Sequence, residues 1–121
     1  MFAPGSANAD WTPAVDIYDS GNGWLVYVEL PGVVTEDVDL TVFHESILLT
    51  GLKRVPAERM IAHKLEIASG YFHRKIDLPG RIDISGVTAS LDDGLLRIVV
   101  PAKEENITRI RVSGNGEKED E

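Results

Sequence analysis

The sequence predicts an all-β domain in which two sheets pack together as a sandwich. Short segments rich in aromatic and β-branched residues recur along the chain, and Gly, Pro, Asn and Asp residues separate them. Few segments show the 3.6-residue period of a helix. The length of 121 residues suits one domain, and a hydrophobic content of 43% is enough for a modest core. These observations together favour a single β-sandwich.

The first half of the chain contains four predicted strands. Residues 14–19 alternate, so that Val15 and Ile17 share a face, and the Gly-Asn-Gly of residues 21–23 forms a turn. Residues 24–30 are rich in aromatic and β-branched side chains and end before Pro31-Gly32. Residues 37–43 alternate cleanly between an apolar and a polar face, and a tight connection leads to the strand of residues 46–52.

The second half begins with a long loop, residues 53–68, and continues with three predicted strands. The apolar residues of the loop fit either one helical turn or a short strand. Residues 71–78 form a strand that ends before Pro79-Gly80. Residues 86–91 and 95–100 pair across Asp93-Gly94, because Gly accepts the positive φ of a hairpin turn. Pro101 lacks a backbone N–H donor and should end the last strand.

The composition excludes several classes of function. A net charge of −8 argues against binding to nucleic acid and to anionic membranes. The chain has no cysteine, no GxxxxGK[ST] or GxSxG motif, and no paired spacing of its three histidines. The sequence therefore predicts no catalytic residue, no metal site and no cofactor. The first ten residues lack the features of a signal peptide, so we expect a cytoplasmic protein that is not an enzyme.

Three segments in order resemble the small heat shock proteins, the Hsp20 family. They are PAVDIYDSGNGWLVYVELPGVVTEDVDLTV at residues 13–42, SGYFHRKIDLP at residues 69–79 and ASLDDGLLRIVVPA at residues 89–102. The resemblance implies the immunoglobulin-like β-sandwich of the α-crystallin domain, expected over residues 11–103. A short N-terminal arm of residues 1–10 would precede this domain, and a C-terminal tail of residues 104–121 would follow it. It also implies an ATP-independent chaperone, a holdase that binds partly unfolded proteins and limits their aggregation.

In this family, two aliphatic residues on the C-terminal tail dock into an apolar groove on a neighbouring subunit. Ile110 and Val112, which are separated by one residue, match that motif. The family's groove lies between two strands that correspond to residues 37–43 and 87–91. The alternation of apolar residues predicts its walls, although ordinary core packing is the alternative for the same six residues: Val38, Leu40, Val42, Val87, Ala89 and Leu91.

The resemblance also implies a dimer interface. In bacterial and plant members the long loop carries an extra strand that pairs with an edge strand of the partner subunit. The candidate here is the segment Arg59, Met60, Ile61 and Ala62, and a solvated loop is the alternative. Arg74 matches an arginine that the family uses in charge networks near this interface. A buried arginine needs a carboxylate partner. The alternative is a surface charge on a half-exposed strand.

The short arm leaves a second function open. Family members usually carry a longer apolar arm that binds clients, whereas ten residues precede Trp11 here. A co-chaperone or adaptor of the p23/CS type, which binds a folded partner, therefore remains an alternative. The tail motif and the long loop favour the chaperone. The expected partners are a second copy of the chain, in a strand-exchanged homodimer or a larger oligomer, and unfolding client proteins.

Overall fold

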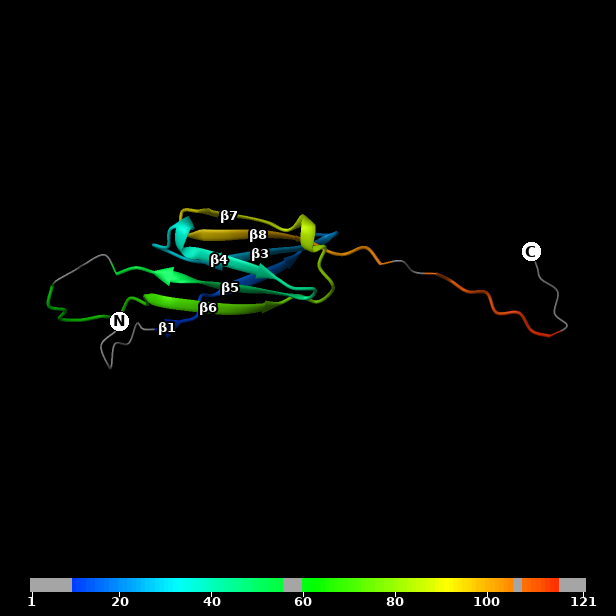
Figure 1. Ribbon diagram of the computed structural model, residues 1–121, viewed down its shortest axis with the longest axis horizontal. Coiled ribbons are helices and arrows are strands. Elements are labelled where there is room, and N and C mark those ends of the chain that lie inside the picture. The colour runs from blue at the N-terminus through cyan, green and yellow to red at the C-terminus, as the bar shows by residue number, and fades with distance from the viewer. Residues whose placement is uncertain (1–9, 56–59, 106–107, 116–121) are drawn as a thin grey trace.

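The computed structural model describes residues 10–55, 60–105 and 108–115. Within these ranges the chain forms two four-stranded sheets that pack face to face, and Figure 1 shows the tail leaving one end of the sandwich. The strand orders are β1-β6-β5-β4 and β2-β3-β8-β7. The predicted all-β sandwich is confirmed.

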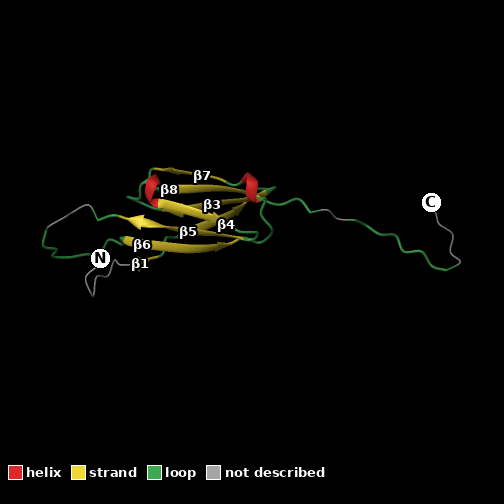
Figure 2. Ribbon diagram, viewed as in Figure 1, coloured by secondary structure: helices red, strands yellow, loops and turns green. Residues whose placement is uncertain are grey.

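The strand positions agree with the sequence prediction to within a residue or two, apart from a short first strand. Two short 3-10 helices, η1 (Thr35–Asp37) and η2 (Ile84–Gly86), lie at opposite ends of the sandwich (Figure 2). The strands are β1 (Asp10–Trp11), β2 (Val15–Asp19), β3 (Gly23–Glu29), β4 (Val38–Val42), β5 (Ser46–Lys53), β6 (Gly70–Asp77), β7 (Thr88–Asp92) and β8 (Leu95–Pro101).

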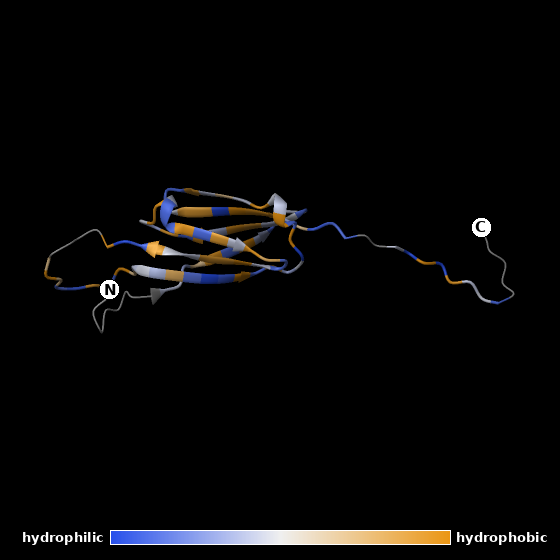
Figure 3. Ribbon diagram, in the orientation of Figure 1, coloured by the Kyte–Doolittle hydropathy of each residue, from blue (hydrophilic) through white to orange (hydrophobic). Residues whose placement is uncertain are grey.

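The core lies between the two sheets and is built from alternate residues of the central strands. In one sheet Val26 of β3 is paired in register with Ile98 of β8, and in the other Ile47 of β5 is paired with Ile76 of β6. Burial of each such side chain contributes roughly 1.5–3 kcal/mol. Figure 3 shows this alternation of hydrophobic and hydrophilic residues along the strands. The buried apolar residues are Val26, Val28, Leu30, Val33, Ile47, Leu49, Phe72, Ile76, Leu78, Ile82, Leu96, Ile98 and Val100.

The β7–β8 hairpin has the two-residue turn that the sequence predicts. Asp93 and Gly94 both have positive φ, at 50° and 78°, as a type I′ turn requires. The Gly94 carbonyl accepts a hydrogen bond of 2.7 Å from the backbone N–H of Leu30, so the turn is tied to the end of β3. Pro101 is the last residue of β8, as expected from its missing donor.

β1 was not predicted from the sequence, and it begins at Asp10, a residue assigned to the arm. This strand pairs in parallel with Tyr71 and Phe72 of β6. Trp11 anchors it, because the indole Nε1 donates a hydrogen bond of 3.2 Å to the Gly70 carbonyl and the ring lies 5.2 Å from that of Phe72. Two residues are too few to show an alternating pattern, so the sequence carried no signal for this strand.

The long loop projects beyond the ends of β5 and β6 (Figure 1). Its described residues from Met60 to Ser69 form neither of the two structures that the sequence left open, a helical turn or a strand. The apolar side chains in this stretch have no sheet face to cover. Most of them are instead exposed to solvent, namely Met60, Ile61, Leu65 and Ile67.

Candidate docking groove

An apolar groove lies where the edge strands of the two sheets come together. β4 is the outer strand of one sheet, and β7 is the outer strand of the other. Between them is a cavity of about 170 Å³, which we call the edge groove. Its lining residues are Thr35, Val38, Leu40, Ala89, Ser90, Leu91 and Leu96.

Backbone alternation places the walls of the edge groove. Val38 and Leu40 point toward the sandwich interior, where they are partly buried, while Asp39 between them is exposed. On the opposite wall Leu91 is partly buried and Ala89 is exposed. Neither edge strand has a further strand beside it among the described residues, so the groove opens to solvent.

The structure brings together four of the six residues predicted for this groove. Val42 and Val87 are not among its lining residues, and both are partly buried against the core. The groove also contains three residues that sequence reasoning missed. Thr35 belongs to a 3-10 helix and Ser90 to the polar face of β7, so neither fits a strand-alternation argument, and Leu96 lies on β8, outside the two strands from which the groove was predicted.

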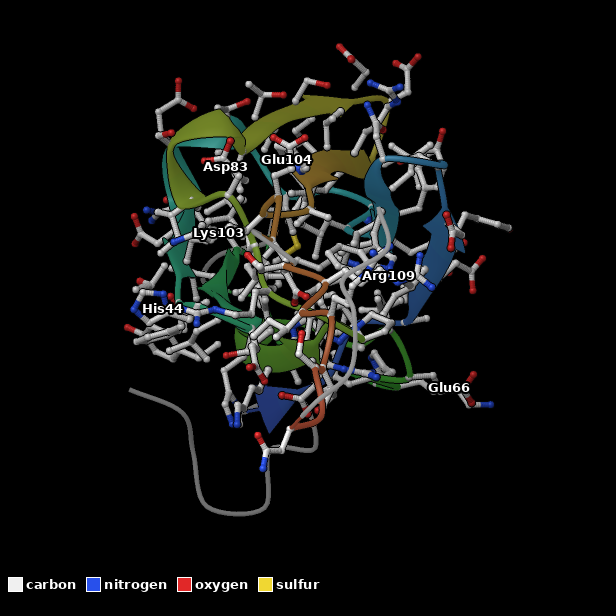
Figure 4. All side chains as sticks on the ribbon, turned by 90° about the vertical axis from the view of Figure 1, so that its right-hand side faces the viewer. His44, Glu66, Asp83, Lys103, Glu104 and Arg109 are labelled. Carbon is white, nitrogen blue, oxygen red and sulfur yellow. The ribbon has the colours of Figure 1, made fainter. Side chains whose placement is uncertain are left out.

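The tail motif is exposed on an extended segment. Ile110 is 77% exposed and Val112 is 86% exposed. Figure 4 looks at the end of the sandwich from which the tail leaves, with Lys103 and Glu104 at its base and Arg109 further along. Isolated aliphatic residues are common on protein surfaces. These two are unusual because nearly the whole of each side chain is exposed and no described sheet lies beside them. The motif is therefore available to another surface.

A second exposed apolar segment lies on the long loop, where the dimer strand was predicted. Met60 is 77% exposed and Ile61 is 88% exposed, and Ala62 is also exposed. Arg59, the first residue of the predicted strand, lies outside the described residues. Among the described strands β2 is the other open edge of its sheet, since it pairs with β3 alone.

Within the single chain Arg74 bonds to a backbone carbonyl. It lies on the same face of β6 as Phe72 and Ile76, and it is partly buried. Its Nη1 donates a hydrogen bond of 3.2 Å to the Pro13 carbonyl. Among the described residues no carboxylate forms an ion pair with Arg74, so the carboxylate partner expected near the dimer interface stays a prediction. A carbonyl is sufficient because partial exposure leaves part of the guanidinium hydrated.

An ion pair fixes η1 beside the edge groove. The guanidinium of Arg54 donates two hydrogen bonds to the carboxylate of Asp37, with N···O distances of 2.7 and 2.9 Å. These hydrogen bonds from Arg54 hold the pKa of Asp37 below its usual value, because they stabilise the charged carboxylate. The same pair raises the pKa of Arg54. The helix that contributes Thr35 to the groove is thus linked to the chain that leaves β5.

Neither a metal centre nor a membrane-spanning helix is found among the residues that the structure describes. In residues 10–55, 60–105 and 108–115 no group of three or more His, Asp or Glu side chains is placed to hold a metal ion. Within the same ranges no helix is long and apolar enough to cross a membrane. Fold and surface together define a β-sandwich domain with an open apolar groove.

Comparison with known proteins identifies the family. The model of the Hsp20/alpha crystallin family matches residues 16–113. The chain therefore belongs to the Hsp20/alpha crystallin family, the small heat shock proteins, and this membership implies a chaperone function.

Individual relatives agree with this assignment. The chain is 32% identical over 112 residues to small heat shock protein C2 of Rickettsia felis, a match that covers 90% of this chain and 73% of the relative. It is 30% identical over 115 residues to the 17.6 kDa class I heat shock protein 1 of Arabidopsis thaliana, covering 93% and 74%. Among solved structures, a small heat-shock protein from Xylella fastidiosa superposes with a TM-score of 0.72 at 29% identity, covering 88% of this chain and 100% of that one.

Proposed function

We propose that this protein is an ATP-independent chaperone that binds partly unfolded proteins and limits their aggregation. The observation that carries the proposal is the pairing of two features in one chain. One is the exposed aliphatic pair Ile110 and Val112, and the other is the open edge groove. Family membership supports the same function.

In this proposal the tail of one subunit docks in the edge groove of another. Burial of two aliphatic side chains contributes roughly 3–5 kcal/mol before the cost of ordering the tail is subtracted. A single contact is therefore weak and reversible. Repetition of the contact around an assembly makes the whole much stronger than one link. The related Xylella fastidiosa protein is described as having a distinct high order structure, which supports such an assembly.

The basic unit of the proposed assembly is a strand-exchanged dimer. The segment Arg59, Met60, Ile61 and Ala62 of one subunit would add to the open edge of β2 in its partner. Strand addition supplies the backbone partners that an edge strand lacks, and it also buries an edge that would otherwise favour aggregation. Arg74, which lies on β6, would be near this interface.

Clients would bind through the same apolar surfaces that hold the subunits together. An unfolding protein exposes apolar side chains, and their burial supplies the driving force without nucleotide. When a tail leaves its groove, both the groove and the aliphatic pair are free to contact the client. Reversible assembly is thus the physical basis of the proposed activity.

An aggregation assay with the full chain tests this function directly. A heat-sensitive client is warmed alone or with the protein in the absence of ATP, and aggregation is followed by light scattering. We expect the protein to suppress scattering and ATP to change nothing. A client that aggregates equally with and without the protein would overturn the proposal and would favour an adaptor that binds a folded partner.

A further inference from the structure

Arg109 precedes the aliphatic pair, and Arg111 lies between its two members. An apolar groove alone gives no reason for either positive charge. We propose that Arg109 and Arg111 of one subunit bind carboxylates at the border of the edge groove of a second copy, so that charge as well as apolar fit selects the tail. The carboxylates are those of Glu36, Asp39 and Asp92. This inference rests on the proposed docking of Ile110 and Val112.

The pattern of the tail separates its apolar and charged side chains. Residues 108–115 contain two arginines and no acid, so this segment carries a charge of +2 in a chain whose net charge is −8. In an extended segment alternate side chains point in opposite directions. With Ile110 and Val112 inserted in the groove, Arg109 and Arg111 point away from its floor. Their long side chains can then reach sideways to the groove borders.

Acidic residues adjoin the lining residues on both walls of the edge groove. Glu36 follows Thr35 in η1, and Asp39 lies between Val38 and Leu40 in β4; both line the adjoining cavity on the outer face of this sheet, so the arginines would reach them across the edge strand. On the other wall Asp92 follows Leu91 at the end of β7. All three acidic residues are exposed, so they can meet an incoming cation without prior desolvation.

These three carboxylates are not already neutralised within the described chain. No described residue forms an ion pair or a side-chain hydrogen bond with Glu36, Asp39 or Asp92. The neighbouring acid Asp37 differs, because Arg54 occupies both of its oxygens. Arg97 lies opposite Ser90 across β7 and β8 and offsets part of the negative charge. The border nevertheless retains an excess of acid beside an apolar floor.

This charge complementarity commits the groove to one occupant, the segment of residues 108–112 from a second copy. A tail segment without cations would leave the border carboxylates unpaired, and a segment with the negative charge of the chain as a whole would be repelled by them. Each exposed charge pair adds little affinity on its own, and salt screens it. The arginines therefore select the tail and make docking sensitive to salt, while the aliphatic pair supplies most of the affinity.

A peptide competition experiment tests the role of the arginines. The receptor is the full chain with Ile110→Asp and Val112→Asp, whose own tail no longer competes for the groove. Fluorescent peptides of residues 108–113 carry the natural sequence, Arg109→Gln with Arg111→Gln, or Ile110→Asp with Val112→Asp. Binding is measured by fluorescence anisotropy at low salt and at about 1 M salt, where the Debye length is about 3 Å.

The three peptides separate the new inference from the docking on which it rests. We expect the glutamine peptide to bind about two- to tenfold more weakly than the natural one at low salt, and equally at high salt. Equal binding of these two peptides at both salt concentrations would overturn the role of the arginines while docking stands. If the aspartate peptide binds as tightly as the natural one, docking itself fails.

Changes in the receptor test the carboxylates. Asp39→Asn with Asp92→Asn should weaken the natural peptide by a similar factor and leave the glutamine peptide unaffected. The matched control is Glu29→Gln with Glu45→Gln, two exposed acids that lie neither in the edge groove nor on β2. This control makes the same change in net charge. If it weakens the natural peptide equally, the effect is one of overall charge and the assigned carboxylates are wrong.

Discussion

Individual residues fix the turn between β7 and β8. Asp93 and Gly94 both adopt positive φ, and a Cβ atom added at Gly94 would lie 3.0 Å from the Pro31 Cα atom. This turn was predictable, because the Asp-Gly pair sits between two apolar strands in the sequence. The pairing of Arg54 with Asp37 was not predictable, since 17 residues separate them and only the folded chain brings η1 to the end of β5.

Replacement of Gly94 tests the turn. Gly94→Val should lower the melting temperature, with a loss of about 1–2 kcal/mol, because a β-branched residue resists positive φ. Gly94→Asn is the matched control, since Asn tolerates this conformation and should lose less. Thermal unfolding followed by circular dichroism gives both values. If the valine variant has the same melting temperature as the wild type, the turn differs from the one described.

The Asp37–Arg54 ion pair predicts a pH-dependent stability. The pKa of Asp37 is lowered in the folded state, so the stabilisation is present above its unfolded value of 3.8 and is lost as pH falls through the folded pKa. Asp37→Asn should therefore be less stable than the wild type near neutral pH. The difference in free energy of unfolding between the variant and the wild type should shrink as the pH is lowered to roughly 3.

Urea unfolding at both pH values measures the contribution of this pair. Arg54→Gln is the matched variant and should show the same pH dependence, because it removes the other partner. A difference between Asp37→Asn and the wild type that stays constant with pH would contradict the assignment of the lowered pKa to this pair.

At the scale of elements, local patterns predicted the long strands but not the short ones. β4 alternates clearly because one of its faces packs on the core, whereas β8 was predicted from its nearly continuous apolar run beside the Asp93-Gly94 turn. β1 has two residues, and it exists because Trp11 packs between Phe72 and Lys53, whose Nζ lies 5.6 Å from the ring centre. Such an anchor depends on residues more than about forty positions away along the chain, which local patterns do not show.

Removal of the anchor should loosen β1. Trp11→Ala deletes the contact with Phe72 and the hydrogen bond to Gly70, and for a partly buried indole we expect a loss of about 1–3 kcal/mol in urea unfolding. Trp11→Phe keeps an aromatic ring and loses the hydrogen bond, so its loss should be smaller, about 1 kcal/mol. Equal unfolding midpoints for Trp11→Ala and the wild type would show that β1 contributes nothing to stability.

At the scale of the whole molecule, the surface features arise from how the two sheets meet. Four residues that strand alternation assigned to one face, Val38, Leu40, Ala89 and Leu91, line the edge groove. It could not place Thr35, because this residue enters the groove through a 3-10 helix whose position depends on the packing of both sheets. The other two residues predicted for the groove, Val42 and Val87, pack against the core instead.

Negative charge placed on the predicted dimer strand of the long loop should weaken the dimer. Met60→Asp with Ile61→Asp should raise the dimer dissociation constant about tenfold or more, because burial of an unpaired carboxylate costs over about 1.4 kcal/mol. Leu65→Asp with Ile67→Asp is the control, with the same charge change in the same loop outside the predicted strand. Sedimentation equilibrium measures both constants. A dimer equally tight in the first variant and the wild type would eliminate strand exchange through these residues.

The mass of the assembly with and without the aliphatic pair tests the central claim most directly. Light scattering after size-exclusion chromatography compares the wild type, Ile110→Asp with Val112→Asp, and a control with the same charge change in the same tail but outside residues 108–112, Asn106→Asp with Asn115→Asp. We predict a mass of many subunits for the wild type and the control, and the mass of a dimer for the first variant. An unchanged mass in that variant would contradict the claim that the tail links subunits through the edge groove.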